Sequence, residues 1–223
     1  MNKVNGAAIG FLGGTFDPIH FGHLRPAIEI QQALNLKSLF LMPNYIAPHK
    51  AKSLASTQQR IDMVKLAIQD TPSLQIDTQE LLRNSPSYTI ETLKLLRQQH
   101  PTTPICFIMG MDSLINFDTW YQYQEILNYC HIVVSHRPGW KPQFNEVVTT
   151  LLSAHQTTDS KQLHLTLCGK IYFQKTTQLA ISSSQIRELA AQHNSIQFLT
   201  PAVVCEYIQT QQCYAPDNKT ATE

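Results

Sequence analysis

The chain has 223 residues, of which 43% are hydrophobic and 15% charged, with a formal net charge of +1 at pH 7. This length can bury the core of a single α/β domain, and so balanced a charge excludes a nucleic-acid binder whose affinity rests on phosphate neutralisation. The five cysteines are scattered without a C-x-x-C pair, and no apolar run reaches membrane-spanning length, so we expect a cytoplasmic protein with reduced thiols that binds neither membrane nor nucleic acid.

The first predicted element is a buried strand at residues 7–12, which two glycines join to an amphipathic helix. A proline has no N–H and is tolerated in the first helical turn, so Pro26 places the start of this helix near Phe21 or Gly22. The amides of residues 22–24 are then unbonded donors at the positive end of the helix dipole. Strand, glycine turn and helix start together predict a phosphate-binding loop.

The residue types of the same stretch strengthen this interpretation. Gly13 and Gly14 can adopt positive φ and, lacking Cβ, let a bulky anion approach the backbone. His20 and His23, three residues apart around the helix start, add imidazole donors on one side. The alternatives are an ordinary turn with unrelated histidines, or a zinc pair, which is disfavoured because only Asp17 lies near at ligand spacing. The pattern is not of the Walker type, because no Gly-Lys-Ser/Thr follows, nor is it the dinucleotide fingerprint, whose third glycine is missing. From the amides, glycines and imidazoles we predict a polyphosphate site without a protein-held metal.

Apolar runs and helical periodicity alternate along the first two thirds of the chain. Further strands are predicted at residues 39–42, 74–77, 105–109 and 131–135, with helices from Ser56, where Gln59 completes a capping box, and from Thr89 to His100. Strands separated by helices imply parallel pairing with right-handed crossovers. The predicted fold class is therefore α/β, a Rossmann-like doubly wound parallel sheet flanked by helices, with its ligand at the carboxyl ends of the strands.

Two loops that precede helices contain groups able to bind anions. His49 and Lys50 end a loop stiffened by two prolines and could meet a phosphate, with a plain exposed loop as the equal alternative. The amides around Tyr88 and Thr89 lie at the start of a helix and predict a second, smaller anion site.

Two more loops follow strands and could contact a nucleoside. Gly110 and Asp112 come directly after the fourth strand, where the carboxylate would lie near a ribose diol unless Asp112 is only a helix N-cap. Trp120 and Tyr121 offer a flat face for an aromatic ring, although a Trp in a short helix usually lies in the core. Arg137 follows the fifth strand in a turn.

The last third of the chain predicts a small C-terminal helical portion. Residues 142–155 read as a polar helix, and 163–167 as a half-buried strand beside 171–173. The polar end of the chain is predicted to be disordered, which gives a single domain at 1–214 and a tail at 215–223.

A serine run opens the next predicted helix. Serine N-caps leave free amides, and Arg187 in the first turn can reach a bound phosphate, the alternative being a solvated helix arginine. Together with the first loop, this segment resembles the paired signatures of the HxGH nucleotidyltransferase superfamily. The two motifs are Gly14-Thr15-Phe16-Asp17-Pro18-x-His20-x-Gly22-His23 and Ile181-Ser182-Ser183-Ser184-Gln185-Ile186-Arg187.

This resemblance implies a reaction and a set of catalytic residues. Both motifs would bind a nucleoside triphosphate, and a substrate phosphate would attack its α-phosphorus directly, without a protein nucleophile. His20, His23 and Arg187 would be the catalytic residues. Mg²⁺ would arrive on ATP, because no carboxylate cluster exists to hold it alone. Asp17 would either orient the turn or position a metal-bound water.

Shorter motifs in the middle of the chain resemble the bacterial nicotinate mononucleotide adenylyltransferases from about residue 10 to 214. They lie at 43–50, 83–89, 110–113, 119–121 and 136–139. This resemblance implies transfer of AMP from ATP to nicotinate mononucleotide, which gives deamido-NAD and pyrophosphate in NAD biosynthesis. Amides near Tyr88, Thr89 and Tyr121 would hold the nicotinate carboxylate, with Trp120 stacked on the ring.

The resemblance also implies two groups of binding residues. Those for ATP would be Gly13, Gly14, Thr15, Phe16, Gly22, Gly110, Asp112, Arg137, Ser183 and Ser184. Those for nicotinate mononucleotide would be His49, Lys50, Tyr88, Thr89, Trp120 and Tyr121. Ser184 departs from the family, which often has Thr there, but the hydroxyl is retained.

Two alternatives remain open from the sequence. A phosphopantetheine or glycerol-phosphate transferase shares the first motif, but such chains are typically shorter and lack the Tyr-Thr and Trp-Tyr loops. A nucleotide-binding sensor without turnover would carry the same loops. Pyrophosphate release with a panel of acceptor phosphates separates the three, whereas the oligomeric state is not predicted.

Overall fold

The computed structural model describes residue 4 and residues 6–45, 53–83, 88–137, 139 and 142–215. In this part of the chain the strands are β1 (Ile9–Gly14), β2 (Leu39–Pro43), β3 (Leu74–Ile76), β4 (Ile105–Gly110), β5 (His131–His136), β6 (Gln156–Thr157) and β7 (Ile171–Lys175). The longer helices are α1 (Phe21–Ala33), α2 (Thr57–Ile68), α4 (Thr89–Gln99), α7 (Glu146–His155), α9 (Ser183–Ala191) and α10 (Ala202–Thr210). The short ones are α3 (Gln79–Leu82), α5 (Met111–Ile115), a 3₁₀ turn (Phe117–Thr119), α6 (Tyr123–Ile126) and α8 (Gln162–Leu165).

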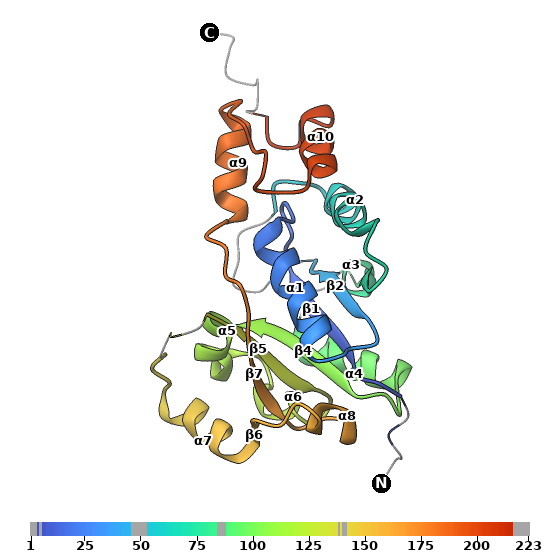
Figure 1. The fold of residues 1–223 in the computed structure, drawn as a ribbon, viewed down its shortest axis with the longest axis vertical. Helices are drawn as coiled ribbons and strands as arrows, with labels where there is room; N and C mark the ends of the chain where they lie inside the picture. The colour runs from blue at the N-terminus through green and yellow to red at the C-terminus, as the bar shows by residue number, and fades with distance from the viewer. Residues whose placement is uncertain are drawn as a thin grey trace.

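The described strands form one seven-stranded parallel sheet in the order β3-β2-β1-β4-β5-β7-β6 (Figure 1). This confirms the predicted Rossmann-like doubly wound fold in a single domain. β1 pairs with β2 on one side and with β4 on the other, so the strand order reverses between β1 and β4. The loops that leave these two strands therefore diverge at the carboxyl edge of the sheet, where such folds bind their ligands.

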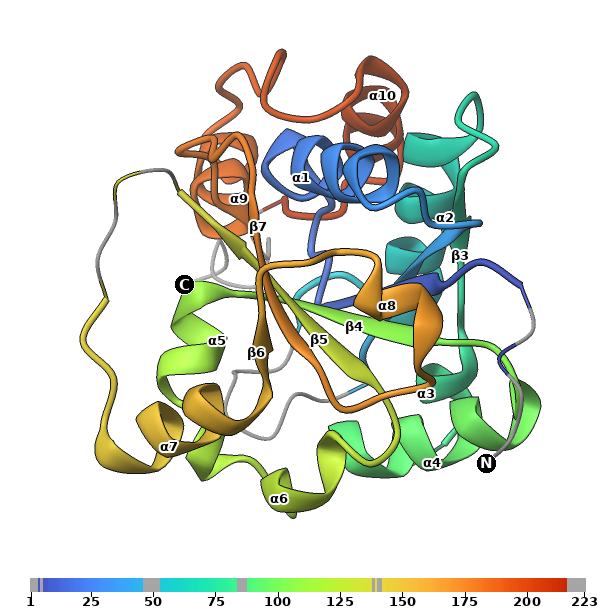
Figure 2. The same cartoon turned by 60° about the horizontal axis from the view of Figure 1, so that its bottom comes forward.

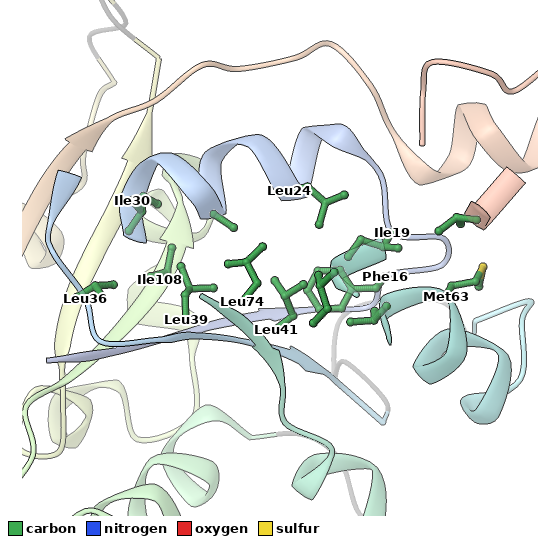
Figure 3. Packing of buried hydrophobic residues seen from close by; sticks show 14 of the residues in the cluster. Phe16, Ile19, Leu24, Ile30, Leu36, Leu39, Leu41, Met63, Leu74 and Ile108 are labelled. Carbon is green, nitrogen blue, oxygen red and sulfur yellow. The ribbon is translucent and has the colours of Figure 1, made fainter. Parts of the chain in front are cut away.

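Helices cover both faces of the sheet, and the side chains along each strand point alternately to one helical layer and to the other. Figure 2 shows α1, α2, α9 and α10 on one face of the sheet, and α4, α5, α6 and α7 on the other. On the first face Leu39, Leu41 and Ile108 pack against α1 and α2 (Figure 3), while Phe11 and Phe107 face the second layer. Each fully buried side chain of this kind stabilises the fold by about 1.5–3 kcal/mol.

The predicted helix starts are largely confirmed. Ser56 caps α2, since its hydroxyl accepts from the Gln59 amide at 3.2 Å and its own amide donates to Gln59 Oε1 at 2.8 Å. α1 begins at Phe21, as expected, but Pro26 then lies inside the helix and beyond its first turn. The helix expected from residue 142 begins at Glu146, with Asn145 as its N-cap.

The strand predicted at residues 163–167 is wrong, because α8 covers Gln162–Leu165. Leu163 is fully buried and Leu165 is 64% exposed, so the alternating pattern does not correspond to one strand face. The His164 ring favours the helix by accepting from the Ala8 amide at 3.1 Å and contacting the Leu34 carbonyl at 2.9 Å. β7 pairs instead with β5 and β6.

The structure also bears on the cysteines and on the apolar segments of the sequence. All five cysteines are free thiols, and burial raises the pKa of Cys106 to about 12, which makes it an inert apolar filler. Within the described ranges, no helix is both long enough and apolar enough to cross a membrane. The predicted tail at 215–223 lies outside the described residues except for Ala215.

Burial of His131 makes the fold sensitive to acid. The ring is fully buried, its Nδ1 accepts from the Lys170 amide at 3.1 Å, and its Nε2 contacts the Thr166 carbonyl at 2.8 Å. Burial lowers the pKa of His131 to about 4, whereas an unfolded histidine titrates near 6.5. The unfolded state therefore binds more protons below pH 6.5, and stability falls as the pH falls towards 4.

We predict that the free energy of unfolding contributed by His131 falls by about 2 kcal/mol between pH 7 and pH 5. His131→Gln, which keeps one donor and one acceptor, should remove most of this loss in urea titrations at the two pH values. His193→Gln, at an exposed position, should leave the pH dependence unchanged. The same acid loss in His131→Gln as in the unmodified protein would contradict the assignment.

Candidate active site

The glycine turn is shaped by the aromatic rings that lie against it. A Cβ on Gly14 would lie 2.7 Å from the Phe16 ring, and one on Gly22 would lie 2.9 Å from Nδ1 of His20, so neither position accepts a larger residue. Phe16 itself has a φ of 49° and is buried. Gly13 is exposed, and a Cβ built there would meet only the Phe107 ring among the described residues, at 3.7 Å, so the backbone of the turn is accessible at the carboxyl edge of the sheet.

The structure brings His20 and His23 together. Their rings stack with centroids 3.8 Å apart and planes inclined by 28°. Burial lowers the pKa of His20 to about 4, so at neutral pH this ring is uncharged and carries a single N–H. His20 Nδ1 and Thr15 Oγ1 are buried and have no hydrogen-bond partner among the described residues. Buried polar atoms are normally paired, so this cluster is suited to a polar ligand.

The expected row of free amides at residues 22–24 is largely wrong. The amides of His23 and Leu24 both donate to the His20 carbonyl, at 2.9 and 3.1 Å. Phe21, the first residue of α1, donates to the Leu199 carbonyl at 3.1 Å. Among the described residues this leaves the Gly22 amide as the unbonded donor of the first turn. Of the main-chain groups that were predicted to bind an anion, the helix dipole and one amide therefore remain available.

The second motif meets the first through the backbone. Three donors from α9 and the following loop bind three successive carbonyls before His20: Arg187 Nη1 to Asp17 at 2.7 Å, Ser183 Oγ to Pro18 at 2.9 Å and Thr200 Oγ1 to Ile19 at 2.7 Å. Arg187 Nη2 also donates to Ser184 Oγ at 3.1 Å. The guanidinium is therefore held beside the turn while its side chain remains 26% exposed.

Arg60 supports the turn from the other side and was not predicted. It is 1% exposed, and its Nη1 donates to the Thr15 and Asn44 carbonyls at 2.8 Å each. A signal was present in the sequence, because Arg60 precedes Met63 and Val64 by helical spacing and so lies on the apolar face of α2.

A cavity of about 590 Å³ opens between the ends of β4 and β5. Its described lining includes Gly110, Asp112, Ser135, Arg137 and Gln178. The volume is in the range of small-ligand pockets. The N-cap of α5 is Gly110 and the Asp112 side chain is exposed, so the interpretation of Asp112 as a plain N-cap is wrong.

Gln178 and Ser135 were not among the predicted site residues. Gln178 Nε2 donates to Ser135 Oγ at 3.1 Å and to Thr176 Oγ1 at 2.7 Å, and the two hydroxyls are 2.7 Å apart. Single polar residues at strand ends carry no pattern that marks them in a sequence.

The aromatic residues predicted for the acceptor also gather in one place. The rings of Tyr88 and Tyr121 are 4.9 Å apart, and both are exposed. Trp120 is half-buried, with Phe117 at 5.5 Å and Phe107 at 6.2 Å. Since Phe107 also approaches Gly13, a single ring separates this aromatic group from the glycine turn. Thr89 begins α4 beside Tyr88, whereas His49 and Lys50 lie outside the described residues.

A protein-held metal does not fit the described residues. They contain no group of three or more His, Cys, Asp or Glu side chains that could hold one. The Asp17 carboxylate, which lies in the turn, already accepts three hydrogen bonds from Leu54, Ala55 and Tyr214.

Comparisons with known proteins agree with this geometry. A family model described as cytidylyltransferase-like matches residues 11–189. Relatives from Psychromonas ingrahamii and Aeromonas salmonicida, both named probable nicotinate-nucleotide adenylyltransferase, are 61% and 48% identical. These matches cover 93% and 95% of this chain and 97% and 99% of the relatives.

A solved structure supports the fold independently. It is the Plasmodium falciparum nicotinic acid mononucleotide adenylyltransferase complexed with NaAD, with a TM-score of 0.71 at 19% identity over 94% of this chain and 98% of that one. The identity of the curated relatives over nearly their whole length confirms the resemblance predicted from the motifs. The chain belongs to the nicotinate-nucleotide adenylyltransferase family of cytidylyltransferase-like nucleotidyltransferases.

Proposed function

We propose that this chain transfers AMP from MgATP to nicotinate mononucleotide, giving deamido-NAD and pyrophosphate. One observation carries the proposal: residues 14–23 and 181–187, far apart in the sequence, interlock into one anion site that a single ring separates from an aromatic group. Two ligands bound at these places would lie within reach of one another. The names of the relatives point to the same substrates.

The triphosphate would lie against the glycine turn. Gly13 gives access to the backbone, the Gly22 amide and the imidazoles donate hydrogen bonds, and Arg187 supplies the permanent positive charge. Because the pKa of His20 is lowered to about 4, its role is that of a neutral donor and not of a cation. Mg²⁺ belongs to the substrate MgATP, since the described side chains form no metal site of their own.

The adenosine would occupy the cavity beyond β4, which Asp112 and Arg137 both line, with Asp112 near the ribose. A phosphate oxygen of nicotinate mononucleotide attacks the α-phosphorus, the bond to the β-phosphate bridging oxygen breaks, and pyrophosphate leaves with Mg²⁺. Such transfers depend on positioning and on charge stabilisation and need no covalent intermediate. The site accordingly needs donors that are fixed before the substrate arrives.

Acceptor choice follows from the direction of hydrogen bonds. The amide of Thr89 at the start of α4 and an amide near Tyr121 donate, and a nicotinate carboxylate accepts. The NH₂ of a nicotinamide would face these donors with another donor. Each unpaired contact in a desolvated pocket costs about 1–3 kcal/mol, so two amount to about 10²–10⁴ in specificity.

The test is pyrophosphate release from ATP and Mg²⁺ with a panel of acceptors. We predict release with nicotinate mononucleotide, and a kcat/KM lower by about 10²–10⁴ with nicotinamide mononucleotide. Thr89→Pro deletes an N–H at a helix position that tolerates proline, and it should reduce the ratio of kcat/KM for nicotinate mononucleotide to that for nicotinamide mononucleotide.

Each other outcome of the panel points elsewhere. No release with any acceptor would refute turnover and leave a nucleotide sensor. Faster release with phosphopantetheine would move the chain to another branch. Equal kcat/KM for the acid and the amide would contradict the acceptor assignment but not adenylyl transfer.

The histidine pair generates a separate prediction. His20→Ala or His23→Ala should lower kcat by about 10²–10³, the effect of losing one preorganised donor, while thermal stability changes little. His23→Asn, which retains a donor, should lose less activity. His155→Ala is the matched control, because it removes an imidazole at the end of α7 that contacts the Gly169 carbonyl. A large loss of stability with unchanged activity per folded molecule would instead mean that the pair only fills the core.

A further inference from the structure

Asp17 joins four segments of the chain through one buried carboxylate. The residue is 3% exposed. Its Oδ1 accepts from the Tyr214 hydroxyl at 2.8 Å and from the Ala55 amide at 3.1 Å, and its Oδ2 accepts from the Leu54 amide at 2.8 Å. The turn, the entry to α2 and the segment that follows α10 therefore meet at this side chain.

The fourth segment is α9, through Arg187. The guanidinium donates to the Asp17 carbonyl at 2.7 Å, and its Nη1 lies 4.0 Å from Asp17 Oδ2. Asp17 thus holds Arg187 through both its main chain and its charge. A rotation of the Asp17 side chain would disturb the position of the guanidinium that is proposed to meet ATP.

A carboxylate at this place is electrostatically unfavourable, so its presence calls for an explanation, and a positioning role supplies one. Burying an ionised group costs several kcal/mol before its partners compensate it. The negative charge of Asp17 also lies beside the site that is proposed to bind the triphosphate, and it repels that polyanion. The two amides, the hydroxyl and the Arg187 charge offset this cost, and Asp17 in turn opposes the lowering of the Arg60 pKa that burial causes.

Tyr214 is the partner that comes from farthest along the chain. It is 6% exposed, and burial together with Asp17 raises the pKa of its hydroxyl far above the usual value, which keeps the group a donor. Tyr207, within α10, makes a similar bond from its hydroxyl to Asp62 Oδ2 at 3.0 Å. That bond ties α10 to α2 without involving the turn.

We propose that Asp17 and Tyr214 are positioning residues for the transfer: the Tyr214 hydroxyl fixes the Asp17 carboxylate, which sets Arg187 and the turn before His20 for the triphosphate. The proposal rests on the proposed role of Arg187 towards ATP. It makes the segment after α10 a part of the support of the active site.

The test compares Tyr214→Phe with Tyr207→Phe, each of which deletes one hydroxyl that is bonded to an aspartate. Tyr214→Phe should lower kcat/KM for ATP by about 10- to 150-fold, the effect of losing a hydrogen bond to a charged group, and leave the KM for nicotinate mononucleotide unchanged. Tyr207→Phe should lower the melting temperature about as much as Tyr214→Phe does. It should leave kcat/KM for ATP and the KM for nicotinate mononucleotide unchanged.

A double-mutant cycle with Arg187→Ala separates positioning from general weakening. If Tyr214 acts through Arg187, Tyr214→Phe should change ATP affinity, measured by calorimetry, by less than about 2-fold in the Arg187→Ala background. An undiminished effect in that background would overturn the proposal, as would a Tyr214→Phe that behaves like Tyr207→Phe.

The binding measurement also keeps the two proposals distinct. If the unmodified protein releases no pyrophosphate, the proposed function fails, but the coupling of Tyr214 to Arg187 is still decided by ATP affinity. If turnover is intact and the coupling is absent, only the positioning proposal fails.

Discussion

The active site depends on three successive carbonyls that the local chain leaves without donors. Buried carbonyls need partners, and those of Asp17, Pro18 and Ile19 find them 165 to 181 residues away, in α9 and the loop after it. The turn before His20 is therefore not a self-contained loop. Its conformation is set by the C-terminal part of the chain, so the two motifs form one structural unit.

Most of the hydrogen-bonding groups in this site are neutral. His20 is uncharged at neutral pH, and the turn adds an amide and a helix dipole, so Arg187 supplies the full positive charge among these groups. Fixed neutral donors suit a reaction in which negative charge moves from the attacking phosphate to the leaving pyrophosphate. They need little rearrangement at the moment of transfer. In the positioning role that we propose, the buried Asp17 carboxylate supports the turn and Arg187 and does not contact the substrate.

Local patterns in the sequence predicted β1 to β5, because β1, β2, β4 and β5 contain apolar runs, and they predicted the start of α2, because it carries a complete capping box. The motifs also located the turn, the serine run and the aromatic group. Long-range hydrogen bonds account for what was missed. The His164 ring stabilises a helix where alternation suggested a strand, and the contacts of Arg60 and Tyr214 join segments that no local spacing relates.

The titration of His20 tests most directly whether the turn binds the polyphosphate. Burial lowers its pKa to about 4 in the free protein, and a triphosphate beside the ring would favour the charged form. NMR spectra of the imidazole nitrogens between pH 4 and 8 should show the pKa of His20 raised by about one unit or more when MgATP is present without acceptor. The pKa of His131, at the opposite edge of the sheet, should stay near 4. An unchanged His20 pKa at saturating MgATP would contradict the account.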